Sequence, residues 1–175
     1  MAGASLYPLP DHKRIRGETE AAANGGREEV FHIELKRDQL GRQSKTAALF
    51  PFAGFSMSGD QPVVAEAFQI RNKSGQVIGV ASRLEGIVPD SIGEPSLAVN
   101  WLLVIPARGA LLLEQKRVMS DVVAPGMQAL HGRMTWGDRE FAELSGSYIE
   151  ARMGMGSGEP KIVLSTRLAS ASVTP

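Results

Sequence analysis

Acidic and amide side chains interrupt apolar runs at a few points in the sequence, and these positions are the first candidates for chemistry. Glu66 lies within the run VVAEAFQI, and Gln115 follows the apolar run GALLL, one residue after Glu114. A carboxylate can take up and return a proton, and a side-chain amide can donate hydrogen bonds to a carbonyl oxygen. We therefore expect Glu66 and Gln115 to be the catalytic residues of this chain.

Further candidates are polar, aromatic or adaptable side chains on the same runs. Residues two apart share one face of a strand, which groups Arg83 with Glu85 and Tyr148 with Glu150. The same rule separates Glu66 from Gln69, so a regular strand turns only one of them inward. The alternative for each charged residue is a solvated outer face, and for each tryptophan a place in the core. The expected substrate-binding residues of the body are Gln69, Arg83, Trp101, His131, Arg133, Met134 and Tyr148.

Composition excludes several other chemistries. The 175 residues contain no cysteine, so disulfides, thiol nucleophiles and thiolate metal sites are ruled out. The three histidines are far apart, so we expect no metal site and no cofactor. Lys+Arg and Asp+Glu both number 19, and this balance argues against a nucleic acid or an anionic membrane as partner. The glycine-rich run 154–158 has no following lysine and indicates a hairpin turn instead of a phosphate loop.

The candidate residues lie on elements that alternate with the period of β-strands. No segment predicts a convincing helix. Regularly spaced short strands with turn residues between them indicate a closed sheet, here a single eight-stranded antiparallel β-barrel. Several strands are apolar on both faces, and a second copy of the chain could cover the outer face as a homodimer. The expected strands are 28–36, 63–71, 76–88, 97–105, 110–119, 129–136, 144–155 and 161–169.

The first 27 residues differ from the body of the chain, which spans residues 28–175. They are mostly polar and predict a mobile N-terminal arm. Leu6, Tyr7 and Leu9 form an apolar segment within it, so the arm could act as a lid that contacts the substrate. The arm lacks the apolar core of a secretory signal, and no apolar stretch could span a bilayer. We expect a cytoplasmic protein.

Two segments resemble a known barrel family. The run 49–60, with its Leu-Phe-Pro-Phe and Met-Ser-Gly-Asp, is similar to the opening segment of allene oxide cyclases. The segment 131–149 resembles the closing hairpin of that family and of dirigent proteins, through Gly137, Phe141, Gly146 and Tyr148. The resemblance covers about residues 28–170 and implies a calycin-type barrel. Its small bacterial members form spirotetronates and spirotetramates by intramolecular [4+2] cycloaddition, without targeting segments.

The resemblance therefore implies a cofactor-independent cyclase of polyketide metabolism. Its substrate would be an apolar linear polyene with a tetronate or tetramate head, and Gln115 would donate a hydrogen bond to the carbonyl of that head. Such a reaction needs a folded substrate and a few donors, and no nucleophile. Two alternatives stay open. One is an isomerase or hydrolase that uses a carboxylate such as Glu66 or Glu150, and the other is a non-catalytic, dirigent-like or lipocalin-like binding protein.

Overall fold

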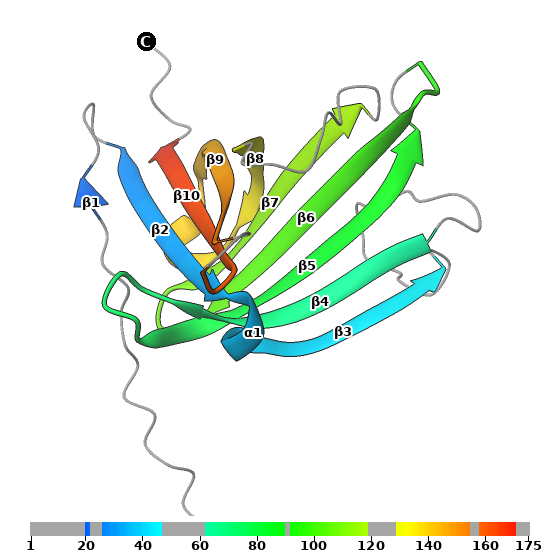
Figure 1. Cartoon of the computed structure of the whole chain (residues 1–175). Coiled ribbons are helices and arrows are strands. Elements are labelled where there is room, and N and C mark those ends of the chain that lie inside the picture. The colour runs from blue at the N-terminus through cyan, green and yellow to red at the C-terminus, as the bar shows by residue number, and fades with distance from the viewer. Residues whose placement is uncertain are drawn as a thin grey trace, which may run out of the picture.

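The structure is a computed structural model, and it describes residues 20–21, 26–46, 62–89, 92–118, 129–154 and 158–170. Within these ranges almost every segment is a strand (Figure 1). In chain order the elements are β1 (Glu20–Ala21), β2 (Arg27–Glu34), α1 (Leu35–Asp38), β3 (Gln39–Thr46), β4 (Pro62–Arg71), β5 (Val77–Pro89), β6 (Pro95–Ile105), β7 (Gly109–Val118), β8 (Leu130–Gly137), the 3-10 turn η3 (Arg139–Phe141), β9 (Leu144–Met153) and β10 (Lys161–Ser170).

Eight of these strands close into a barrel, as the sequence predicted. Antiparallel pairing runs in the order β2, β10, β9, β8, β7, β6, β5 and β4, and β4 then returns to β2. That return is a single pair, His32 opposite Arg71, which we call the seam. Strand β3 lies beyond the seam on β4, and β1 lies on β2. The predicted all-β class and the eight-stranded antiparallel barrel are therefore confirmed.

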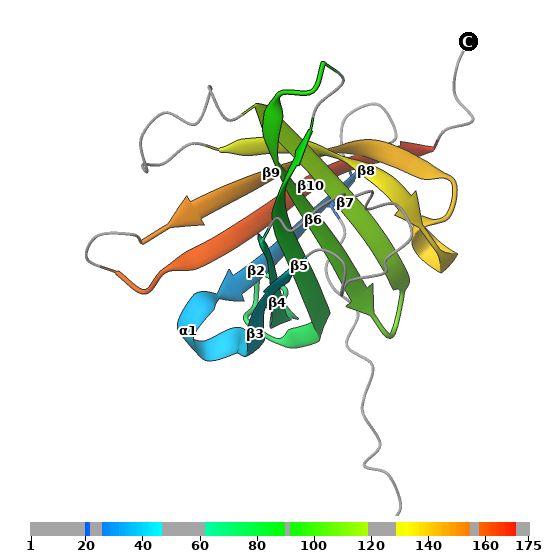
Figure 2. The same cartoon turned by 90° about the vertical axis from the view of Figure 1, so that its right-hand side faces the viewer.

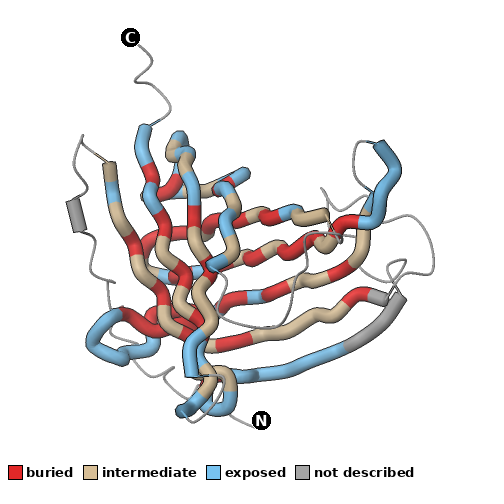
Figure 3. The backbone as a smooth tube through the Cα atoms, turned by 45° about the horizontal axis from the view of Figure 1, so that its top comes forward, coloured by how far each residue is buried: buried red, intermediate tan, exposed pale blue. Residues whose placement is uncertain are grey.

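The barrel is flattened into two groups of strands that cross. In Figure 1, β2, β10 and β9 stand upright, and β4 to β7 run obliquely across them; Figure 2 shows the same crossing from the side. Most strands alternate between buried and less buried residues because one face looks inward, although β6 also buries the adjacent Ala98 and Val99. In β6, Trp101, Leu103 and Ile105 are fully buried, whereas Val104 is exposed. Figure 3 shows this alternation as buried and exposed stretches along each strand.

One glycine lets two strands of the barrel approach closely. A Cβ built on Gly146 in β9 would lie 1.9 Å from the backbone oxygen of Arg167 in β10. No side chain fits there, so the close contact of β9 with β10 depends on glycine at this position.

One end of the barrel, which we call the closed end, is sealed by a buried ion pair. The guanidinium of Arg108, in the turn between β6 and β7, donates to both carboxylate oxygens of Glu29 at 2.6 and 2.8 Å. Its Nε donates to Glu140 at 3.0 Å, and the group lies 4.9 Å from the ring centroid of Phe141. Paired charges that also hydrogen-bond are the form in which ions tolerate such burial.

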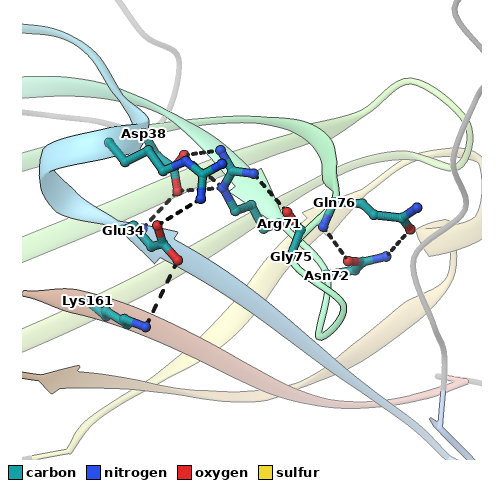
Figure 4. A network of polar contacts seen from close by, with 8 residues as sticks. Glu34, Asp38, Arg71, Asn72, Gly75, Gln76 and Lys161 are labelled. Atoms are coloured by element: carbon teal, nitrogen blue, oxygen red, sulfur yellow. Dashed lines mark hydrogen bonds and ion pairs between the residues drawn. The ribbon is translucent and has the colours of Figure 1, made fainter. Parts of the chain in front are cut away.

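A second network ties α1 to the seam (Figure 4). Asp38 is fully buried and accepts from the guanidinium of Arg71, with Nη2 to Oδ1 at 2.7 Å. Arg71 also donates to the backbone oxygen of Gly75 at 2.8 Å, in the β4–β5 turn. The expectation of no helix was wrong here. Residues 35–38 form one helical turn, because that turn brings Asp38 to Arg71, a contact 33 residues distant in the chain.

The strand β3 was also missed by the sequence analysis. Its segment, QLGRQSKT, is polar and lacks alternating apolar residues. Among the described residues it pairs with β4 on one side, through a register shift between Gln39 and Gly41, and has no strand on the other. A strand outside the closed barrel has no inner face to bury, so its sequence carries no alternation.

Candidate functional site

A group of polar side chains lies inside the barrel, among otherwise apolar inward positions. The strand register places them at neighbouring sites. Arg83 of β5 is opposite Glu66 of β4 on one side and Trp101 of β6 on the other. Gln115 of β7 is opposite Val99 and follows the inward Leu113 by two residues. We call the inward-facing residues Glu66, Arg83, Glu85, Trp101, Gln115, Tyr148, Glu150 and Arg152 the inner cluster.

Arg83 links three strands of this cluster. Its Nη1 donates to Oε2 of Glu66 at 3.2 Å, and its Nη2 donates to Oε2 of Glu85. The guanidinium carbon lies 5.7 Å from the ring centroid of Trp101, within the range of a cation–π contact. Only 5% of the Arg83 side chain is exposed.

The charges around Arg83 keep it ionised in spite of its burial. Burial alone would lower the pKa of the guanidinium. The surrounding carboxylates outweigh that effect, with Glu150 contributing most, and raise the pKa above its ordinary value. Arg83 is therefore a permanent cation inside the barrel.

Glu150 is the most deeply buried carboxylate of the inner cluster. Its side chain is 0% exposed, and it accepts from two donors on different strands. The indole Nε1 of Trp101 donates to Oε2 at 2.9 Å, and Nε of Arg152 donates to Oε1 at 3.1 Å. The indole ring is therefore held in one orientation by a hydrogen bond at its edge.

Tyr148 and Gln115 form a second contact across the interior. The Tyr148 hydroxyl donates to Oε1 of Gln115 at 3.5 Å, and both residues are buried. Burial, reinforced by the charge of Glu150, raises the pKa of Tyr148 well above its ordinary value, so the phenol keeps its proton. Because the Gln115 oxygen faces this hydroxyl, its amide N–H groups are the end that can donate to a ligand.

Exposure rises along the inner cluster toward one end of the barrel. The exposed fraction of the side chain is 15% at Glu66, 31% at Glu85 and 38% at Arg152. Inward-facing apolar residues at the same end, including Ile87 and Leu130, are only half-buried. Inward positions that keep contact with solvent mark the accessible end of a barrel, and we call it the open end.

This geometry can be set beside known proteins. No protein-family model matches the chain, and no curated protein matches it closely. Among solved structures, pyocyanin demethylase is similar with a TM-score of 0.52 and 11% sequence identity, over 81% of this chain and 99% of that one. An exo-specific intermolecular Diels-Alderase is similar with a TM-score of 0.49 and 11% identity, over 81% and 94% of the chains.

A dirigent protein, a pterocarpan synthase, is similar with a TM-score of 0.47 and 10% identity, over 81% of this chain and 90% of that one. At such low identity, the likeness to the demethylase shows a shared fold and carries no information about activity. The resemblance stated from the sequence is thus confirmed at the level of the barrel.

Six of the residues expected from the sequence face the interior. Five of them belong to the inner cluster, and Met134 is buried beside it in the apolar core. Glu66 and Gln69 fall on opposite faces, as alternation requires. The six inward-facing residues are Glu66, Arg83, Trp101, Gln115, Met134 and Tyr148.

Three expected residues lie on the outer face of the barrel and do not join the inner cluster. Gln69 is opposite the exposed Val80. His131 is exposed, and Arg133 is paired at 3.3 Å with Glu114 on the outer face. Leu6, Tyr7 and Leu9 of the expected lid lie outside the described residues.

Two residues proved more central than the sequence suggested. Glu150 was expected only in an alternative mechanism, yet it connects Trp101 with Arg152, and Glu85 pairs with Arg83. The sequence feature that could have indicated them was the two-residue spacing of Glu150 from Tyr148 and of Glu85 from Arg83.

Within the described ranges no group of three or more His, Cys, Asp or Glu side chains could hold a metal ion. No helix in the described part of the chain is long and apolar enough to span a membrane.

Proposed function

We propose that this protein is a cofactor-independent cyclase that folds a linear polyene inside its barrel and promotes an intramolecular [4+2] cycloaddition. The observation that supports this most is the inner cluster. It places a fixed indole, an amide and a phenol that keeps its proton inside the barrel, deeper than the half-exposed residues Glu85 and Arg152 of the open end. A polyene would extend along the apolar wall, and a carbonyl-bearing head would meet the donors.

The reaction requires no covalent bond between the substrate and the protein. Two carbon–carbon bonds form while the π electrons of the diene and the dienophile rearrange, and no proton or electron is exchanged. The barrel would hold the diene and the dienophile close together. The loss of conformational entropy then occurs on binding and no longer adds to the reaction barrier. The face of Trp101 would pack on the conjugated chain.

The donors would lower the barrier electrostatically. A carbonyl attached to the dienophile gains negative charge as the bonds form. The amide N–H groups of Gln115 would donate to that oxygen, and the Tyr148 hydroxyl would hold the amide in place through its contact with Oε1. Glu66, expected as catalytic, would act on Arg83 by fixing the direction of its guanidinium.

The experiment uses a synthetic linear triene that carries an α,β-unsaturated ketone. Cyclisation removes the polyene absorbance without changing the mass, so absorbance and chromatography follow it. We expect the protein to accelerate the reaction and to enrich one stereoisomer. Gln115→Leu should lower kcat by about tenfold or more, the equivalent of one hydrogen bond to a developing charge. Gln69→Leu, a matched change on the outer face, should leave kcat unaltered.

Two results would contradict the proposal. If the triene binds but cyclises at the uncatalysed rate with unchanged stereoisomers, the protein is a binding module. If it cyclises equally fast with Gln115→Leu, the amide has no part in the reaction.

The expected lid is tested with the same substrate by deleting residues 1–19, which leaves β1 in place. Turnover should fall more than thermal stability, and unchanged turnover would exclude a lid.

The buried carboxylate of Glu150 favours one alternative, an isomerase that moves a proton inside the barrel. That mechanism requires the carboxylate to change its protonation state in each cycle, so its rate should depend on pH with an acidic limb. A pericyclic reaction involves no such step, so we expect a flat rate profile in the same range. Glu150→Gln distinguishes them further, because it would abolish proton transfer.

A further inference from the structure

One buried donor inside the barrel has no acceptor. Of the polar atoms of the Arg83 guanidinium, Nη1 is bound to Glu66 and Nη2 to Glu85, but Nε has no hydrogen-bond partner. Only 5% of the Arg83 side chain is exposed, so this N–H lies away from bulk solvent. A buried N–H without a partner costs free energy, and an acceptor that reached it would recover that cost.

The position of this N–H suits a ligand. Arg83 faces the barrel interior opposite Trp101, and its guanidinium lies against the indole ring. The inner cluster becomes more exposed from Arg83 toward Glu85, which is 31% exposed. A molecule that entered past Glu85 at the open end would approach Arg83 with its leading polar end.

The charges around Arg83 limit what kind of acceptor can approach. The carboxylates of Glu66 and Glu85 already occupy its two terminal nitrogens, and Glu150 raises its pKa from nearby. An anionic ligand would meet three carboxylates and would have to compete with them for one guanidinium. An uncharged oxygen can accept from Nε without displacing either carboxylate and without repulsion.

We propose that Nε of Arg83 is the docking point for the polar end of the ligand, and that the site selects an uncharged carbonyl oxygen over a carboxylate. This inference rests on the proposed function in one respect, that the ligand is a polyene bound inside the barrel. It adds the substrate class: neutral ketones, esters or lactones attached to an apolar conjugated chain. An acidic head group would bind in its protonated form.

The test compares two fluorescent polyenes that share one chain, cis-parinaric acid and its methyl ester. Their affinities are measured by fluorescence titration at about pH 8, where the acid is ionised. We expect the ester to bind about tenfold more tightly or better. Lowering the pH toward about 5 should tighten binding of the acid and leave the ester unchanged, and this needs no variant.

The variant Arg83→Lys separates selection at Nε from the greater hydrophobicity of the ester. Lysine keeps the positive charge for both glutamates but has no N–H at the Nε position. We expect it to weaken ester binding about fivefold or more and to reduce the preference for the ester. The matched surface change Arg133→Lys should keep both affinities, and a thermal unfolding curve shows whether each variant is folded.

The outcomes distinguish this inference from the proposed function. Tighter binding of the acid would overturn it and indicate that outer cations such as Arg152 decide recognition. An ester affinity that is the same in Arg83→Lys would also overturn it. If neither polyene binds, this inference fails, and cyclisation of the synthetic triene alone decides the cyclase proposal. If the ester is selected through Arg83 but the synthetic triene is not cyclised, this inference stands and the cyclase proposal fails.

Discussion

Replacing Arg71 by methionine tests how the barrel is closed. Strands β2 and β4 meet in one pair only, His32 opposite Arg71, so backbone pairing contributes little at the seam. The guanidinium of Arg71 holds the seam from the other side by bonding to Asp38 at 2.7 and 2.9 Å and to the Gly75 carbonyl at 2.8 Å. Methionine keeps much of the side-chain volume and removes all of these bonds.

The magnitude follows from what Asp38 loses. Its side chain is 0% exposed, and without Arg71 its carboxylate retains the backbone N–H of Glu34 at 2.9 Å. Removing one partner of a buried ion pair costs about 3–5 kcal/mol, because the other charge stays buried. With a urea m-value of about 2 kcal/mol/M, the unfolding midpoint should fall by about 1.5–2.5 M.

The assay is urea unfolding followed by tryptophan fluorescence, with two comparisons. Arg133→Met removes an exposed ion pair, with Arg133 76% exposed, and should cost less than about 1 kcal/mol. The double variant Asp38→Asn/Arg71→Met contains no buried unpaired charge and should be more stable than Arg71→Met alone. The reasoning is refuted if Arg71→Met costs no more than Arg133→Met, or if the double variant is less stable than the single one.

Three further predictions concern other parts of the barrel. Gly146→Ala should lower the free energy of unfolding, measured by chemical denaturation, by about 3 kcal/mol or more, because the alanine Cβ would overlap the backbone of β10. Gly41→Ala, where the Cβ meets open space, should change it by less than about 0.5 kcal/mol. Burial, with two nearby lysines, lowers the pKa of His32, so the folded state favours its neutral form. Stability should therefore fall as the pH drops below about 6.5, and it should fall less in His32→Gln, as thermal unfolding at each pH shows; an equal fall in His32→Gln would contradict this. Because the pKa of Tyr148 is raised in the folded state, stability should fall above about pH 10. In an ultraviolet titration one of the two tyrosines should ionise only as the protein unfolds, and this phase should be absent from Tyr148→Phe. Ionisation of both tyrosines in the folded protein would contradict this.

The class of fold could be predicted from local patterns alone. Alternating apolar residues and turn signals indicate the strands, and the bounds of all eight barrel strands lie within two residues of the expected ranges, as 97–105 does within β6. β3 could not be predicted, because it packs on one strand only and needs no apolar face. Nor could α1, whose one helical turn is stabilised by a contact between Asp38 and a residue far along the chain.

The inner cluster was predicted in part. The rule that residues two apart share one face of a strand separated Glu66 from Gln69, and the structure turns Glu66 inward. This rule fails where a strand bulges. Leu112 pairs with Trp136 but Leu113 pairs with Met134, so one residue of β8 is skipped. Trp136 and Met134 therefore fall on opposite faces, although they are two apart in sequence, and Arg133 points outward.

By itself the sequence determined the all-β class, the number of barrel strands and the absence of thiol chemistry, because these depend on residue type and period-two alternation. Only the tertiary structure decided which side chains meet. Trp101 and Glu150 are 49 residues apart, and Arg83 and Glu66 are 17 apart. Their contacts depend on the register between strands and on closure at the seam, which are set by packing of the whole barrel. That packing also left Nε of Arg83 buried without an acceptor, and no property of the sequence alone could indicate it.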